Sequence, residues 1–462
     1  MFGALVGPGR DPLEMLTRFA HQYGDVTFFK LGGERCYFIN DPDAIRDVLV
    51  THQRNFTKSR GLERAKKLLG NGLLTAEGAT HLRHRRLLQP AFHRDRIAGY
   101  AQVMIDCAAR TAARWRDDET LDISREMMRL TLSIAGKTLF DTDVESSADE
   151  VGAAVTEVLE SFWLNLLPGA DLLEQLPIPK LRRAHDARRR LDALIYEMIA
   201  ARRATGTDRG DLLSMLIAAA DTAPAAPAAP VAPSAPSAPG APGAPGAPGL
   251  SDEEIRDEAM TILLAGHETT ANALTWTLYL LTQNPDAAAR LQQELDDVLG
   301  GRTPTPGDYP HLTYTRRVVT ESMRLFPPAW IIGRRSIDEH AIGEYRLPPR
   351  SIVFMSPFVM QRDARFYEQP EQFNPDRWTA AFEAARPRFA YFPFGGGARQ
   401  CIGEQFAWME AVLAVATLVQ RWRFQLDPAQ RIVLQPLVTL RSKYGMRMRL
   451  TRFPRTGGQL SG

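Results

Sequence analysis

The sequence predicts a mainly α-helical fold with a smaller β part. Segments with helical apolar spacing cover much of the chain, at residues 43–50, 80–91, 100–116, 123–140 and 183–204. Strand patterns are fewer. The run DVTFFKL, the turn GGER and the run CYFIN predict an early hairpin, and a strand pair is expected at 345–347 and 352–356. Another helix is expected from just after Cys401 to about residue 422.

The clearest helix signal begins at Ser251. Ser251 and Glu254 form a Ser-x-x-Glu capping box, and Asp252 and Glu253 add acidic residues to the first turn. The pattern continues to Asn284-Pro285, which predicts a helix about 50 Å long. Its middle is mostly apolar, so we expect it to cross the centre of the molecule.

Composition and charge exclude several classes of protein. The 462 residues are 44% hydrophobic and 24% charged, with a net charge of +2, which gives no reason to expect nucleic-acid binding. Three widely spaced cysteines exclude a disulfide framework and suit a reducing compartment. No stretch reaches the roughly 18 apolar residues of a membrane helix. We expect a cytoplasmic monomer that neither binds nucleic acid nor spans a membrane.

Residues 222–249 differ from the rest of the chain. Proline recurs every third residue from Pro224 to Pro248, with Ala, Ser and Gly between. Such a segment cannot bury a core, and we expect it to be disordered, solvated and similar to polyproline II. It could link two domains. The residues discussed below lie on both sides of it and are expected to share one site, so we predict a single domain, 1–462, with an insertion at 222–249.

The most informative stretch runs from Phe394 to Gly403 and contains three consecutive glycines before Ala398, Arg399, Gln400 and Cys401. Glycines allow positive φ and a close approach of the backbone to a flat ligand. Free backbone N–H groups and the start of the following helix are expected to lower the pKa of the Cys401 thiol, and only a thiolate binds a metal. Arg399 could serve the thiolate loop or a ligand carboxylate. The alternative is a buried free cysteine after a glycine turn.

This stretch resembles the haem-binding signature of the cytochrome P-450 family, Phe-x-x-Gly-x-Arg-x-Cys-x-Gly, at all five specified positions. The matching residues are Phe394, Gly397, Arg399, Cys401 and Gly403. The resemblance implies a triangular, mainly helical fold and a haem b cofactor whose iron is bound by Cys401. Such a thiolate ligand favours cleavage of the O–O bond.

The sequence Ala265-Gly-His-Glu-Thr269-Thr in the middle of the long helix is similar to the family's oxygen-binding motif. The resemblance implies that Glu268 and Thr269 help to deliver protons during activation of dioxygen. A Thr hydroxyl can also bond back to a carbonyl of the preceding turn, which would be a purely structural role. A zinc-protease HExxH pattern is excluded because Ala271 stands where the second histidine is needed.

Further resemblances imply anchors for the haem propionates and a structural triad. His81 and Arg85 are spaced i, i+4 and match the family's propionate-binding pair, although they could also form a solvated basic face. Arg334 stands where another propionate partner is expected, and Arg335 could replace it. Glu321, Arg324 and Arg377 match the family's Glu-Arg-Arg triad, which is expected to be structural.

The resemblance implies a monooxygenase that inserts one oxygen atom from dioxygen into a lipophilic substrate, by hydroxylation or epoxidation. No flavin or iron–sulfur region is expected, so electrons would come from a ferredoxin or flavodoxin-type donor with its reductase. Surplus basic residues near His81 suit docking of an acidic donor. Two alternatives remain open, a peroxide-driven peroxygenase and a non-catalytic haem-thiolate sensor.

Overall fold

The computed structural model describes residues 11–31, 33–142, 150–158, 178–221 and 250–453. The helices with defined bounds are α2 (Pro12–Tyr23), α3 (Pro42–Arg46), α4 (Arg60–Leu69), α5 (Gly78–Leu88), α6 (Arg94–Arg114), α7 (Ile123–Phe140), α10 (Pro179–Thr205), α11 (Leu212–Asp221), α12 (Asp252–Gln283), α13 (Pro285–Leu299), α14 (Thr313–Leu325), α15 (Pro357–Met360), α16 (Ala380–Ala385) and α17 (Glu404–Val419). The strands are β1 (Val26–Leu31), β2 (Glu34–Ile39), β3 (Phe56–Lys58), β4 (Glu119–Asp122), β5 (Ile332–Ser336), β6 (His340–Ile342), β7 (Tyr345–Leu347), β8 (Ile352–Met355), β9 (Trp422–Leu426), β10 (Leu434–Pro436), β11 (Leu440–Ser442) and β12 (Arg447–Arg452). The predicted class, mainly α with a smaller β part, is confirmed.

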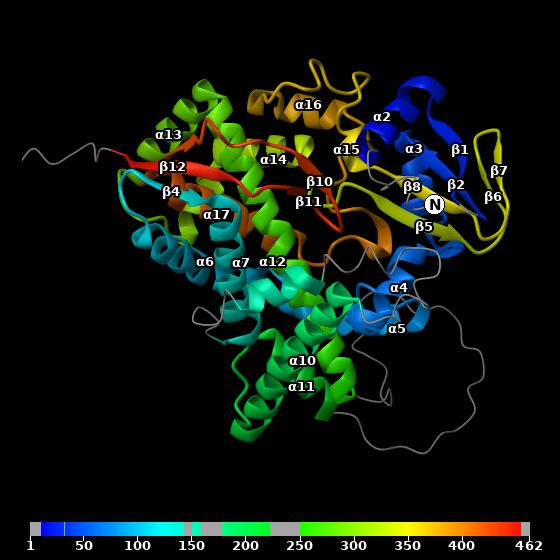
Figure 1. The fold of residues 1–462 in the computed structure, drawn as a ribbon, viewed down its shortest axis with the longest axis horizontal. Helices are drawn as coiled ribbons and strands as arrows, with labels where there is room; N and C mark the ends of the chain where they lie inside the picture. The colour runs from blue at the N-terminus through cyan, green and yellow to red at the C-terminus, as the bar shows by residue number, and fades with distance from the viewer. Residues whose placement is uncertain (1–10, 32, 143–149, 159–177, 222–249, 454–462) are drawn as a thin grey trace, which may run out of the picture.

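Helix α12 runs through the middle of the molecule, with α7 and α17 beside it (Figure 1). Its capping box forms as predicted, because Ser251 accepts from the Glu254 N–H at 3.1 Å and Glu254 accepts from the Ser251 N–H at 2.9 Å. Trp276 is fully buried on α12, stacks on Phe326 with ring centroids 4.4 Å apart, and donates to the Leu440 carbonyl. The core helix is therefore tied both to α14 and to the C-terminal strands.

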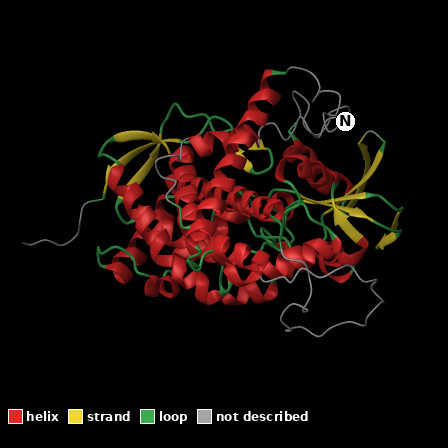
Figure 2. Cartoon of the chain, turned by 90° about the horizontal axis from the view of Figure 1, so that it is seen from below, coloured by secondary structure: helices red, strands yellow, loops and turns green. Residues whose placement is uncertain are grey.

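The strands gather at two ends of the helical body (Figure 2). One sheet has the order β1-β2-β8-β5-β3, in which only the β2–β8 pair is parallel. The second has the order β4-β12-β9, and β6-β7 and β10-β11 form separate antiparallel pairs. The predicted hairpin of β1 and β2 is confirmed.

The expected pairing of the strands at 345–347 and 352–356 is wrong. β7 pairs with β6, whereas β8 lies between β2 and β5 in the five-stranded sheet. All four β8 residues are buried, while β7 is exposed at two of three positions. A fully buried strand needs a neighbour on each side. For β8 these neighbours are β2, near the start of the chain, and β5.

The segment 222–249 lies outside the described residues, so its role as an insertion stays a prediction. Strands from both sides of it share sheets, because β2 pairs with β8 and β4 pairs with β12. Within the described ranges, no helix is long and apolar enough to cross a membrane.

Candidate haem-thiolate site

The cysteine loop has the conformation that its glycines predict. Gly395 and Gly397 have φ of 72° and 70°, and the Cys401 N–H donates to the Phe394 carbonyl at 3.0 Å. A Cβ at Gly397 would lie 1.9 Å from the carbonyl oxygen of Leu49, so no other residue fits there. Phe394 is half-buried and packs on Trp408 with ring centroids 5.7 Å apart. The loop is thus fixed between the start of α17 and the segment that follows α3.

Cys401 is exposed, whereas Cys36 and Cys107 are buried. The expected lowering of its pKa is wrong for the polypeptide alone. Although the residue is accessible, the protein atoms around its sulfur desolvate the thiolate and raise the pKa of the thiol to about 11. The Gly403 backbone N–H opposes this rise, as the sequence suggested, and so does Arg85, which the sequence did not indicate; Glu404 in the first turn of α17 adds to the rise. A metal ion bound at this position would deprotonate the thiol, because a coordinating thiol is deprotonated by the metal itself.

The middle of α12 exposes a small face within an otherwise buried helix. Ala265 is exposed, Gly266 and Thr269 are half-exposed, and a Cβ at Gly266 would meet nothing within 4 Å. The Thr269 hydroxyl donates to the Ala265 carbonyl at 2.6 Å, which confirms the predicted bond to the preceding turn. A flat ligand can approach the backbone of α12 at this face.

Glu268 faces a different direction from this open face and binds the C-terminal hairpin. Its Oε1 atom lies 2.5 Å from Arg441 Nε and accepts from the Thr439 hydroxyl at 2.6 Å. Asn272, one turn later on α12, donates to the Thr439 oxygen at 3.0 Å. The Glu268 side chain is 3% exposed and that of Arg441 is 12% exposed, so this is a nearly buried ion pair. Sequence reasoning missed Arg441 because it lies 173 residues away.

Helix α5 brings two of the predicted anchors to the cysteine loop. Arg85 donates to the Gln400 carbonyl at 2.6 Å, and its positive charge is close enough to Cys401 to affect the pKa of both groups. His81 is buried, and its pKa is lowered to about 4 by burial and by the neighbouring charges of Lys58, Arg399 and Arg85. The imidazole of His81 is therefore neutral at pH 7.

Arg334 and Arg399 extend this positive cluster. Arg399 donates to the Phe56 carbonyl at 2.8 Å and to Glu77 at 2.6 Å, while its buried Nε has no hydrogen-bond partner among the described residues. Arg334 is 7% exposed, and burial and Arg399 lower its pKa to about 10, opposed by Glu77. Arg335 points away and binds the carboxylates of Glu34 and Glu63. Between the two arginines that the sequence left open, only Arg334 lies in the cluster.

Lys58 is a member of the cluster that the sequence did not reveal. It is buried on β3, and its ammonium donates to the carbonyls of Leu73 and Ala76 at 2.8 and 2.6 Å. Burial and two neighbouring arginines lower its pKa to about 7, although Glu77 raises it. Among the described residues, Glu77 is the carboxylate that lies close to these cations, so the cluster carries more positive than negative charge. No sequence pattern singles out a lysine in a short strand.

The predicted structural triad is confirmed. Arg324 donates to both carboxylate oxygens of Glu321 at 2.8 Å, and Arg377 donates to Oε1 at 2.9 Å. Trp378 adds a bond to Oε2 at 2.8 Å, and Glu321 and Arg324 are fully buried. Arg324 also donates to the Gln361 carbonyl, which ties α14 to the chain after α15. This network fixes the polypeptide ahead of the cysteine loop.

Comparisons with known proteins identify the family. The family model described as Cytochrome P450 matches residues 1–445. Cyclooctatin synthase of Streptomyces melanosporofaciens is 41% identical over 93% of this chain and 89% of its own length. Cyclooctat-9-en-7-ol 5-monooxygenase of the same organism is 34% identical over 93% and 88%. Pentalenene oxygenase of Streptomyces avermitilis is 35% identical over 97% and 94%.

The chain belongs to the cytochrome P450 family. It is a haem-thiolate monooxygenase of lipophilic substrates, with iron protoporphyrin IX as cofactor and with dioxygen and redox partners as reactants. The described residues fit this cofactor. Cys401 offers an accessible sulfur, the face around Gly266 admits a flat ring, and Arg399 Nε is a buried donor that has no partner in the part of the chain that the structure describes. The surplus cations match the negative charge of two propionate groups.

Proposed function

We propose that this chain inserts one oxygen atom from dioxygen into a lipophilic cyclic alkene or alkenol, with Cys401 as the ligand of the haem iron. The observation that carries the assignment of Cys401 is its exposure on a glycine loop next to a buried cluster of cations. The substrate class is drawn from two relatives, whose names specify pentalenene and cyclooctat-9-en-7-ol. The second oxygen atom leaves as water, with electrons from a redox partner and protons from solvent.

We propose that the remaining site residues divide into anchors and proton carriers. Haem, when bound, supplies the activation of dioxygen. His81, Arg85, Arg334, Arg399 and Lys58 hold the propionates, and Phe394 packs beside the thiolate loop. Thr269 turns its hydroxyl from the Ala265 carbonyl to donate a proton on the open face of α12. Glu268 then returns a proton to this region from the solvent side at Arg441.

We propose that the electron donor is a ferredoxin or a flavodoxin-type protein with its reductase, and that the chain acts as a cytoplasmic monomer. Arg86 is exposed on α5, and Arg94 is exposed at the start of α6. Arg85, also on α5, contacts the cysteine loop. Negative charge on the donor would match this basic surface. Electron transfer should therefore slow as ionic strength rises. Size-exclusion chromatography with light scattering tests the monomer.

The decisive experiment is the difference spectrum of the reduced protein with carbon monoxide. The haem-loaded protein should give the Soret band of a thiolate ligand, and Cys401→Ala should lose it while Cys107→Ala keeps it. Retention of the band in Cys401→Ala would contradict the assignment. Turnover with hydrogen peroxide alone would favour a peroxygenase. Substrate-induced spin shifts without product under any electron supply would favour a sensor.

A further inference from the structure

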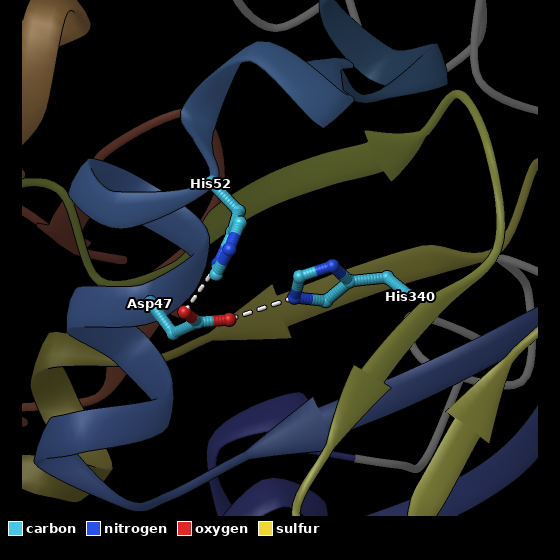
Figure 3. A group of neighbouring side chains, drawn as sticks. All are labelled: Asp47, His52 and His340. Atoms are coloured by element: carbon cyan, nitrogen blue, oxygen red, sulfur yellow. Dashed lines mark hydrogen bonds and ion pairs between the residues drawn. The ribbon is translucent and has the colours of Figure 1, made fainter.

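A second group of potential ligands lies outside the haem site. Asp47, His52 and His340 place one carboxylate and two imidazoles together, with each ligand atom within 4.8 Å of the others (Figure 3). His52 Nδ1 lies 2.5 Å from Asp47 Oδ1, and His340 Nε2 lies 2.7 Å from Asp47 Oδ2. His340 opens β6, and the other two residues flank the segment after α3. None of the residues assigned to the haem site belongs to this group.

The backbone at Asp47 has an unusual conformation that brings two of these residues together. Asp47–Thr51 forms a π-helical turn, η1, and the His52 N–H donates to the Asp47 carbonyl five residues back at 2.8 Å. In a regular α-helix, residues five apart point about 140° away from each other. The wider π turn places Asp47 and His52 on one face. Such turns are rare and occur frequently at functional sites.

We propose that Asp47, His52 and His340 form a binding site for a divalent transition-metal ion, with zinc as the best-suited ion. Two imidazole nitrogens and one carboxylate oxygen match the three protein ligands of a tetrahedral zinc site, leaving one position for water. Imidazole donors favour zinc, copper or nickel and disfavour magnesium and calcium, which prefer oxygen ligands. The two nitrogens that face the carboxylate are the atoms that would bind the ion.

The surroundings of the three residues suit a site that is rigid on one side and open on the other. The His52 side chain is 55% exposed and gives solvent access, whereas that of His340 is 9% exposed. The His340 ring packs edge-on against Phe56, with centroids 4.9 Å apart. In the described part of the chain, Asp47 forms ion pairs with the two histidines. A divalent ion would replace the two hydrogen bonds of Asp47 to the histidines with three ligand bonds.

The proposed site shares its supporting segment with the cysteine loop. The Leu49 carbonyl, within η1, is the atom that excludes a side chain at Gly397. The Gln53 side chain, just after η1, accepts from the Ala398 N–H at 2.6 Å. A metal ion that ties Asp47 to His340 would therefore hold η1 against the loop. Because it binds the folded chain only, it would also raise the unfolding temperature.

The test measures zinc binding to the haem-loaded protein by equilibrium dialysis and metal analysis. We expect one zinc ion per chain that magnesium does not displace, and binding about tenfold weaker or more in His52→Ala and in Asp47→Asn. His93→Ala is the matched control, because His93 is exposed and lies 3.5 Å from Asp95 without a third ligand. Its zinc binding should equal that of the wild type.

A second measurement, the unfolding temperature with and without zinc, distinguishes a variant that has lost the site from one that has not folded. Zinc should raise the unfolding temperature of the wild type and of His93→Ala, but not that of His52→Ala. Equal zinc affinity in the wild type and in His52→Ala would overturn the proposal, and so would an absence of zinc binding in the wild type. Neither result depends on the carbon monoxide spectrum or on turnover, so failure here is distinct from failure of the proposed function.

Discussion

Arg441 Nε on β11 lies 2.5 Å from Glu268 Oε1 on α12, so the acid next to Thr269 is bound to the C-terminal hairpin. The hydroxyl of Thr439 donates to the same oxygen. Glu268 and Thr269 are neighbours in sequence but point to different partners, because the Thr269 hydroxyl bonds back to Ala265. A proton that passes between them must therefore cross from the hairpin side of α12 to its open face.

Arg441→Met should lower both stability and coupling. Removing the arginine leaves the nearly buried Glu268 carboxylate without its cation, which should cost about 3 kcal/mol of the free energy of unfolding. Without Arg441 to position it, Glu268 should also deliver protons less effectively, so less product should form for each dioxygen consumed. Denaturant unfolding and the ratio of product to dioxygen measure the two effects.

The matched control is Arg447→Met, on β12, the strand that follows β11 in the chain. Arg447 is 62% exposed and lies 3.5 Å from Asp427, so its loss should change the free energy of unfolding by less than about 1 kcal/mol. Normal coupling in Arg441→Met would contradict a positioning role for Arg441 even if the variant were less stable. Glu268→Gln should lower coupling without removing the arginine.

Arg334→Gln should weaken haem binding, whereas Arg335→Gln should not. The two residues are neighbours on β5, but Arg334 faces the buried cluster and Arg335 binds Glu34 and Glu63. Loss of a charge-assisted bond to a propionate should speed haem release about tenfold or more. Transfer of haem to an excess of an apo-globin measures that rate. Equal rates in the two variants would exclude Arg334 as an anchor.

The same substitution should not lower the stability of the haem-free chain, although it weakens haem binding. Burial lowers the pKa of Arg334, so its charge is costly where no propionate is present. Arg334→Gln should therefore not destabilise the haem-free protein. Denaturant unfolding of haem-free samples measures this effect, and a large loss of stability there would indicate a structural role in place of an anchor.

Local patterns explain which parts of the fold and site were predictable. The capping box at Ser251 and the glycines before Cys401 act over a few residues, and both have the predicted geometry. The partners of Glu268 and the buried position of Lys58 depend on segments that are distant in the chain, so no local pattern reveals them.

The net pKa of Cys401 was mispredicted for a related reason. The sequence indicated one effect that lowers it, the backbone N–H groups, but not the second, the charge of Arg85. It gave no measure of how strongly the surrounding polypeptide desolvates the sulfur, which is the largest effect and has the opposite sign. The predicted pairing of β7 with β8 was wrong for a similar reason, because the neighbours of a strand depend on burial across the whole sheet.

Glu321→Gln should strongly destabilise the protein. Glu321 accepts bonds from Arg324, Arg377 and Trp378 in a fully buried position, and a neutral amide leaves the arginines without their counter-ion. The expected loss is about 3–5 kcal/mol, measured by denaturant unfolding. Glu383→Gln is the matched control, since Glu383 also begins a Glu-x-x-Arg pattern but is exposed. Its stability should be close to that of the wild type.

Glu410→Gln should change how stability depends on pH. Glu410 is fully buried on α17, and this burial raises its pKa well above the usual 4.5. Between pH 4.5 and the raised pKa, the folded chain keeps a proton that the unfolded chain has lost. The contribution to stability is therefore complete below pH 4.5 and declines by about 1.4 kcal/mol per pH unit above it. Glutamine cannot ionise, so the variant should lack this decline and become the more stable protein as pH rises.

Denaturant midpoints across the pH range measure this difference, with Glu344→Gln in the exposed turn between β6 and β7 as control. The control should follow the wild-type curve at every pH, because an exposed carboxyl has the same surroundings in both states. Parallel curves for Glu410→Gln and the wild type would show that Glu410 ionises alike in the folded and unfolded chains. They would contradict a neutral carboxyl beside Thr270. A diverging pair would instead establish a protonated acid within the core, on α17 and close to Thr270, the residue that follows Thr269 on α12.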